Sequence, residues 1–178
     1  KDRVELSRYI GSVFGQRSQL WFHLPPADSF KLLGAIYEIE DDDRLWRQAE
    51  LVERFGIQSY LDVPVRKLSL GERIRCEIAA ALLPAPRILF LDEPTTGLDP
   101  NQIVEIRELI KELGREKTVI LSTHILSEVE ATCDRILIIN KGKIVADGTS
   151  ETLRKQAAGQ ETVNVRIRSE ERRVGKEC

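Results

Sequence analysis

Short apolar runs that alternate with helix-like segments constrain the fold of this chain more than any other feature. The order strand, helix, strand, helix, strand is predicted at 88–91, 101–113, 118–121, 126–132 and 136–139. The first of these helices is expected to end at Gly114. Because strands that alternate with helices are joined by crossover connections, the pattern predicts a parallel sheet covered by helices on both faces.

Helices are predicted to dominate the preceding part of the chain. An apolar run at 10–14 indicates one more strand, and residues 28–83 have helical periodicity. Asp28 or Ser29 is suited to cap the first of these helices. The acidic cluster at 40–43 favours the start of a second helix, because negative charge is stabilised at a helix N-terminus.

The composition is that of a globular protein without a charge bias toward particular partners. Lysine plus arginine is 27 and aspartate plus glutamate is 29, a formal net charge of −2. This balance argues against nucleic acid or an anionic membrane surface as a partner. No apolar run approaches the ~20 residues of a membrane-spanning helix. The three cysteines, Cys76, Cys133 and Cys178, have no regular spacing, which indicates reduced thiols rather than a disulfide framework or a zinc site.

Two strand ends carry residues that suit phosphate chemistry. Ligands of parallel sheets bind beyond the carboxyl ends of strands, so Asp92 is placed to hold Mg²⁺. Its neighbour Glu93 could orient or deprotonate an attacking water. His124 follows the run at 118–121, and an imidazole there would reach both a γ-phosphate and the Glu93 carboxylate. Taken singly, each residue is also compatible with a solvated or structural strand end.

Two further segments place capping residues at the start of a helix. Ser69 is a good N-cap residue, and Gly71 lets a backbone approach closely. The amides at a helix N-terminus offer hydrogen-bond donors to an anion. Asp99 precedes Pro100, which suits the first position of a helix. Each segment is by itself consistent with a helix cap and nothing more.

Taken in order, these segments resemble the ATP-binding cassette (ABC) ATPase family. The order is Leu-Ser-x-Gly-Glu at 68–72, apolar-Asp-Glu-Pro at 91–94, Thr-Gly-Leu-Asp at 96–99 and Ser-Thr-His at 122–124. The resemblance covers about residues 10–150, and it is strongest to export-type ATPases of the ABC-2 kind, including drug, viologen and gliding-motility ATPases. It implies an α/β fold of the P-loop NTPase class, with a mostly parallel sheet and a helical subdomain.

The resemblance also implies ATP and Mg²⁺ as cofactors and a role for each matching residue. Glu93 would be the catalytic base and His124 the switch histidine. Nucleotide or metal contacts would come from Gln16, Ser69, Gly71, Glu72, Asp92 and Asp99. Within this set, Asp92 and the Q-loop residue Gln16 would serve Mg²⁺, with Gln19 as a weaker alternative to Gln16. The 68–72 segment would meet the ATP of the opposite subunit.

The implied partners are a second copy of the subunit and a separate transmembrane permease, with no nucleic acid. The protein would then be cytoplasmic and peripheral, touching the membrane only through the permease. The aromatic segment 20–26 would face that permease, unless Trp21 and Phe22 belong to the core. Two alternatives remain: a soluble ABC ATPase that acts on ribosomes or DNA, and an inactive fragment unable to bind ATP alone.

One expected motif does not occur in the sequence. The phosphate-binding loop, Walker A, requires Gly-x-x-x-x-Gly-Lys-Ser/Thr. The pairs Gly142-Lys143 and Gly175-Lys176 lack both the earlier glycine and the following hydroxyl residue. We therefore expect the Walker A region to lie before Lys1 and the chain to be truncated there.

The motifs divide the chain into five expected segments. These are a Q-loop region at 1–27, a helical subdomain ending in the signature helix at 28–83, a catalytic lobe with Walker B, D-loop and switch histidine at 84–150, a C-terminal extension at 151–167, and a tail at 168–178. The tail resembles a translated sequencing adapter, so we expect it to be non-native. Within the lobe, residues 140–143 are typical of a hairpin turn.

Overall fold

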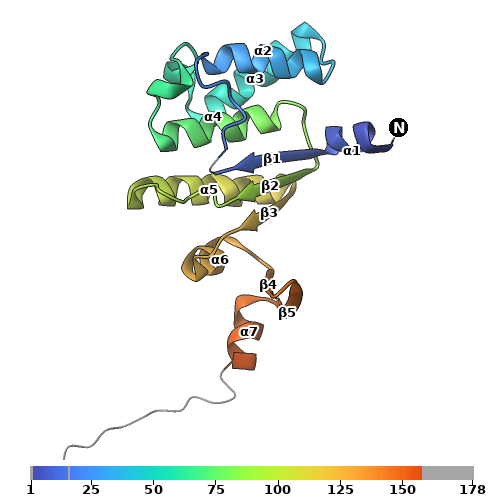
Figure 1. Ribbon diagram of the computed structural model, residues 1–178, viewed down its shortest axis with the longest axis vertical. Helices are drawn as coiled ribbons and strands as arrows, with labels where there is room; N and C mark the ends of the chain where they lie inside the picture. Colours follow the sequence, from blue (N-terminus) through green and yellow to red (C-terminus); the bar gives the residue numbers. More distant parts are fainter. Residues whose placement is uncertain (1, 16, 158–178) are drawn as a thin grey trace, which may run out of the picture. The chain divides into compact units, whose positions relative to one another are not determined.

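The computed structural model describes residues 2–15 and 17–157, and the chain divides into two compact units between Cys133 and Asp134 (Figure 1). The elements of the first unit are α1 (Asp2–Tyr9), β1 (Ile10–Phe14), α2 (Pro26–Ile36), α3 (Asp41–Phe55), η1 (Gln58–Tyr60), η2 (Val65–Lys67), α4 (Leu70–Leu82), β2 (Ile88–Asp92), α5 (Pro100–Glu116), β3 (Thr118–Ser122) and α6 (Leu126–Thr132). The expected tail at 168–178 and most of the expected extension at 151–167 lie outside the described residues.

The first unit is built on a three-stranded parallel sheet in the order β1-β2-β3. The three strands expected at 10–14, 88–91 and 118–121 are therefore confirmed, and so is the α/β class. Helices α2, α3 and α4 pack against one another and lie together beside the sheet (Figure 1). Helix α5 connects β2 to β3 and packs on β3.

Only one face of this sheet is covered within the described part of the chain. Val13, Leu89 and Leu91 are buried in one core cluster with residues of α4 and α5. On the opposite face, Phe90 and Ile120 remain exposed, because no described helix packs against them. The expectation of a sheet covered on both faces is therefore wrong for the described residues.

Two helix boundaries differ from the sequence prediction. Helix α2 begins at Pro26 and not after Asp28 or Ser29, because proline is favoured in the first helical position and Pro25 takes the N-cap place. Helix α5 does not end at Gly114 but continues to Glu116, where the buried side chain of Leu113 holds the last turns against the core. The start of α3 in the acidic cluster is confirmed.

The second unit consists of β4 (Ile136–Asn140), β5 (Lys143–Gly148) and α7 (Ser150–Ala157). Strands β4 and β5 form an antiparallel pair, which confirms the hairpin turn. The turn residues Lys141 and Gly142 have φ values of 48° and 73°, the backbone that two-residue hairpins require. Strand β4 thus pairs with its neighbour in a sheet of its own, and its expected place in the parallel sheet is wrong.

No helix in residues 2–15 and 17–157 has both the length and the apolar character needed to cross a bilayer. Cys76 is buried in α4, and burial raises the pKa of its thiol to about 12, with Glu72 and Glu77 adding to the rise. The thiol therefore stays protonated near neutral pH, as expected of an inert core cysteine.

Helix α4 also buries a carboxylate in the core. Glu77 is 1% exposed, and neither of its oxygens accepts a hydrogen bond from the described residues. Burial raises the pKa of Glu77, and the nearby Ser18 hydroxyl and Arg73 guanidinium offset only part of that rise. Nε of Arg73 lies 3.6 Å from Oε1 of Glu77, a long ion pair. The charged form of Glu77 therefore costs folding free energy.

We predict that Glu77→Gln raises the free energy of unfolding at about pH 7.5. A folded-state pKa above the ordinary value of 4.5 means that the native protein binds this proton more tightly than the unfolded chain. Stability is then lost as pH rises through the folded pKa, and the neutral amide escapes that loss. Urea unfolding should show the gain at about pH 7.5 and a smaller difference below about pH 4. A variant less stable than the parent at pH 7.5 contradicts the prediction.

We predict that Gly11→Ala destabilises the first unit by about 1–3 kcal/mol. A Cβ at Gly11 would lie 2.8 Å from the backbone oxygen of Ala81 and 3.1 Å from Cδ1 of Leu89, so β1 and α4 would have to separate. The matched control is Gly114→Ala in α5, where an added Cβ meets no described atom within 4 Å. That change should stabilise the helix by about 0.5–1 kcal/mol. Equal urea unfolding midpoints for Gly11→Ala and Gly114→Ala, or a higher midpoint for Gly11→Ala, would contradict the packing argument.

Candidate functional site

The parallel register brings three strand ends to one edge of the sheet. Phe14 pairs with Asp92, and Asp92 pairs with Ser122, so the residues after them leave the sheet side by side. Two backbone hydrogen bonds extend the alignment beyond the strands. The amide of Gly15 donates to the oxygen of Asp92 at 2.8 Å, and the amide of Glu93 donates to the oxygen of Ser122 at 2.9 Å.

Asp92 presents its carboxylate at the end of β2. The side chain is exposed, and Oδ1 accepts a hydrogen bond from the Ser122 hydroxyl. This bond engages one of the two carboxylate oxygens of an exposed side chain. Beside Asp92, the uncovered sheet face forms an open hollow of about 500 Å³, lined by Ser12, Phe14, Phe90, Leu91, Asp92, Ile120 and Ser122.

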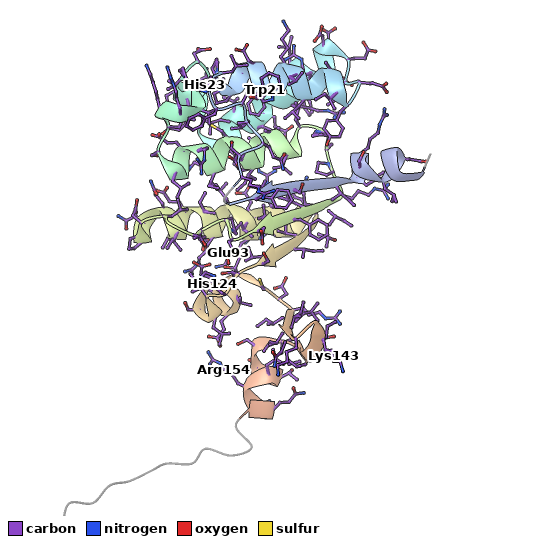
Figure 2. All side chains as sticks on the ribbon, in the orientation of Figure 1. Trp21, His23, Glu93, His124, Lys143 and Arg154 are labelled. Atoms are coloured by element: carbon purple, nitrogen blue, oxygen red, sulfur yellow. The ribbon has the colours of Figure 1, made fainter. Side chains whose placement is uncertain are left out.

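Glu93 and His124 are in direct contact. Nδ1 of His124 lies 2.9 Å from Oε1 of Glu93, and the Thr96 hydroxyl donates to Oε2 at 3.2 Å. Figure 2 shows the two labelled side chains next to each other where β2 and β3 end. A protonated imidazole in this position donates from Nδ1 to Glu93 and offers Nε2–H to an anion. The sequence prediction that an imidazole reaches this carboxylate agrees with the distance.

The backbone of Glu93 has an unusual conformation. Its φ is 47°, in the left-handed region that side chains other than glycine rarely adopt. Gly15 packs against this peptide so closely that a Cβ on Gly15 would lie 2.5 Å from the Glu93 oxygen. The bend turns the chain sharply after Asp92, which lets two adjacent carboxylates point in different directions. Strain of this kind is characteristic of functional sites.

The segment at 68–72 forms a complete helix cap. The Ser69 hydroxyl accepts from the amide of Glu72 at 3.3 Å, and the Glu72 carboxylate accepts from the amide of Ser69 at 2.8 Å. Ser69 is therefore confirmed as the N-cap of α4. Gly71 is buried, and a Cβ there would lie 2.7 Å from the side-chain amide carbon of Gln102 in α5.

Asp99 is engaged in a similar local role. Its Oδ1 accepts from the amides of Asn101 and Gln102, both at 3.0 Å, and Pro100 takes the first position of α5 as expected. Gln102 thus contacts both capped segments, through its backbone at Asp99 and its side chain at Gly71. Gln102 has no motif of its own in the sequence and was not among the predicted site residues.

The aromatic segment 20–26 contributes to the surface as well as to the core. Trp21 and Phe22 are 55% and 53% exposed, whereas Leu20 is buried. The interpretation of these two aromatic side chains as core residues is therefore wrong. Figure 2 shows Trp21 and His23 on the side of the unit where α2 lies.

The structure gathers some of the predicted site residues and separates others. Asp92, Glu93 and His124 share the sheet edge, whereas Ser69, Gly71, Glu72 and Asp99 lie at the starts of α4 and α5. Gln16 lies outside the described residues. Its weaker alternative, Gln19, folds back so that its amide donates to the backbone oxygen of Ser12.

The donor set at the edge suits a magnesium ion that keeps most of its water. No group of three or more histidine, cysteine, aspartate or glutamate side chains able to hold a metal occurs in the residues that the structure describes. Mg²⁺ binds proteins through one or two carboxylates together with substrate phosphates. Asp92, with one oxygen anchored and one available, fits that requirement.

Two buried polar residues behind the edge were not predicted. Thr95 and Glu128 are each 4% exposed, and the Thr95 hydroxyl donates to Oε2 of Glu128 at 2.7 Å. In the sequence, Glu128 looks like an ordinary surface acid of a short helix, and only its place four residues after His124 connects it with the site.

Comparison with known proteins identifies the family of this chain. Residues 5–130 match the family model described as "AAA domain, putative AbiEii toxin, Type IV TA system". The chain is 35% identical over 154 residues to the ABC transporter ATP-binding protein NatA of Bacillus subtilis, an alignment covering 86% of this chain and 63% of NatA. The chain belongs to the ABC ATPase family. The motifs at 68–72, 91–94, 96–99 and 122–124 thus stand in an ABC ATPase fold.

Further relatives carry names of resistance and transport proteins. The chain is 34% identical to the daunorubicin/doxorubicin resistance ATP-binding protein DrrA of Streptomyces peucetius, covering 92% of this chain and 49% of DrrA. It is 36% identical to the bacitracin transport ATP-binding protein BcrA of Bacillus licheniformis, covering 88% of this chain and 50% of BcrA. This ABC ATPase chain therefore spans about half to two thirds of the length of these relatives.

A solved structure shows the same architecture. The chain superposes on cbiO1 of Clostridium perfringens, part of the ABC transporter complex cbiONQ, with a TM-score of 0.74 and 31% identity. The match covers 86% of this chain and 62% of cbiO1. The parallel sheet with its helical layer is therefore that of the ABC ATPase fold.

We predict that Glu93→Gly gives a more stable protein than Glu93→Ala, by about 1 kcal/mol. Both changes remove the contact with His124, so the difference reports the left-handed backbone, which costs alanine more than glycine. Urea unfolding of the two variants measures it. At Glu108, which is exposed in α5, the order should be reversed, because glycine weakens a helix interior. If Glu93→Ala were as stable as Glu93→Gly or more stable, the bend at position 93 would carry no strain.

Proposed function

We propose that this ABC ATPase binds and hydrolyses ATP with Mg²⁺ and thereby drives transport through a separate transmembrane permease. The observation that carries the proposal is the contact between Glu93 and His124 beside Asp92, at the edge where parallel sheets bind their ligands. The names of NatA, DrrA and BcrA support a transporter rather than an ABC ATPase acting on ribosomes or DNA.

In this proposal, the chain's own residues divide the work at the γ-phosphate. Asp92 would hold Mg²⁺, with Gln16 as the second expected contact. When bound, Mg²⁺ would neutralise the negative charge of the phosphate oxygens. Glu93 orients the attacking water and accepts its proton. His124 holds the Glu93 carboxylate through Nδ1 and donates from Nε2 to the γ-phosphate, so that base and phosphate are fixed by one side chain.

The capped segments would act across a homodimer. Ser69, Gly71 and Glu72 would approach the ATP of the opposite subunit, and Asp99 would lie at the dimer interface. The N-terminus of α4 supports this arrangement, because helix N-terminal amides favour a phosphate. The phosphate-binding loop itself is expected from a Walker A segment, which the sequence of this chain does not contain.

The proposed transport direction is export, in line with the resistance proteins among the relatives. The exposed Trp21 and Phe22 are suited to contact the permease, because large aromatic side chains are enriched in protein interfaces. The protein would then lie at the cytoplasmic face of the membrane and touch it through the permease alone, without binding nucleic acid.

We predict that Glu93→Gln in the full-length protein retains ATP binding and lowers ATP turnover by roughly 10²- to 10⁴-fold. The amide keeps the size of the side chain but cannot accept the proton of the attacking water. Phosphate release measures turnover, and a fluorescent nucleotide displaced by ATP measures binding. The matched control is Glu108→Gln, which removes an exposed carboxylate paired only locally with Lys111 and should leave both unchanged. Undiminished turnover in Glu93→Gln would refute the role of Glu93.

A further inference from the structure

Behind the Glu93–His124 pair lies a buried carboxylate that the proposed chemistry does not use. Glu128 is 4% exposed and belongs to the first turn of α6. Its Oε2 accepts two hydrogen bonds, from the Thr95 hydroxyl at 2.7 Å and from the Thr123 hydroxyl at 3.2 Å. A buried carboxylate is costly unless it is hydrogen-bonded, so both donors are needed to keep Glu128 inside.

The two donors come from the two segments that carry the site. Thr95 stands two residues after Glu93, on the chain that leaves β2. Thr123 stands directly before His124, on the chain that leaves β3. A single oxygen atom of Glu128 therefore ties together the segments that hold Glu93 and His124, on the buried side of their 2.9 Å contact.

Further contacts fix both segments to the same point. The Thr123 hydroxyl also accepts from the amide of Ile125 at 3.1 Å, so its orientation is set at the start of α6. Thr95 is as buried as Glu128, and the backbone oxygen of Thr95 accepts from the amide of Leu98 at 3.2 Å. If either threonine turned away, Oε2 of Glu128 would lose one of its two hydrogen bonds in the interior.

We propose that Glu128 is a positioning residue, which sets the distance between Glu93 and His124 by accepting hydrogen bonds from Thr95 and Thr123. The inference rests on the proposed function, since it assigns Glu128 to the same hydrolytic site. Glu128 itself does not reach the reacting atoms. It acts through the two threonines, and loss of either hydroxyl separates base and imidazole.

The first test is Thr95→Val in the full-length protein, because valine keeps the shape of threonine and removes only the hydroxyl. Displacement of Glu93 relative to His124 should lower kcat for ATP by roughly 10- to 100-fold and leave the KM for ATP unchanged. The matched control is Thr132→Val in α6, since the Thr132 hydroxyl oxygen is buried without a hydrogen-bond partner among the described residues. That variant should keep the parent's kcat.

Two further variants distinguish positioning from simple loss of stability. Glu128→Gln should keep most of the activity that Glu128→Ala loses. Both threonines donate to the same oxygen of Glu128, and the amide oxygen of glutamine can accept in its place. Thr95→Val added to Glu93→Gln should cause no further loss of turnover, because the residue that it positions is already disabled. A lower unfolding midpoint with unchanged kcat in Thr95→Val would overturn the proposal.

A crystal structure of Thr95→Val tests the inference without any measurement of ATPase activity. We expect the distance from Nδ1 of His124 to Oε1 of Glu93 to exceed hydrogen-bonding range, and an unchanged distance overturns the positioning role. If the parent protein does not hydrolyse ATP with Mg²⁺, the proposed function fails. The crystallographic distance then still tests whether Glu128 sets the geometry of the pair.

Discussion

The parallel register of β1, β2 and β3 is the constraint on which the rest of the structure depends. Because Phe14, Asp92 and Ser122 are direct neighbours, every segment that leaves the sheet after them begins at the same edge. A shift of β2 by one residue would turn Asp92 toward the covered face and bury a charge. Apolar burial of Leu89 and Leu91 on the covered face therefore fixes the position of the carboxylates as well.

Much of this arrangement could be predicted from the sequence, because it rests on local patterns. The strand runs, the cap at Ser69 and the turn at 140–143 each depend on a few adjacent residues with strong preferences. Helix α5 was misjudged at Gly114, because the cost of one glycine, about 1 kcal/mol, is smaller than the gain from burying Leu113. The pairing of β4 with β5 follows from that turn, whereas the expected membership of β4 in the parallel sheet was wrong, because alternation shows that a strand exists but not which sheet it joins.

The polar interior could not be predicted, because burial of a charged residue leaves no local pattern. In α6, Glu128 and Glu130 are both acidic residues in a short helix, yet Glu128 is buried and Glu130 is exposed. What distinguishes them is the position of Thr95, which lies 33 residues away in the sequence. Glu77 is a similar case, since a carboxylate in an apolar helix normally indicates the solvent face and here points into the core.

The helix caps at the starts of α4 and α5 leave different groups available for a ligand. At α4, the reciprocal bonds of Ser69 and Glu72 satisfy the first and last of the four unpaired amides, so the amides of Leu70 and Gly71 remain as donors. At α5, Asp99 takes the amides of Asn101 and Gln102, and Pro100 has none to offer. In the proposed function, a phosphate at the α4 N-terminus would therefore meet the amides of Leu70 and Gly71 and not the two capped ones. Any contact that Asp99 makes with a second subunit must use its remaining carboxylate oxygen or its backbone.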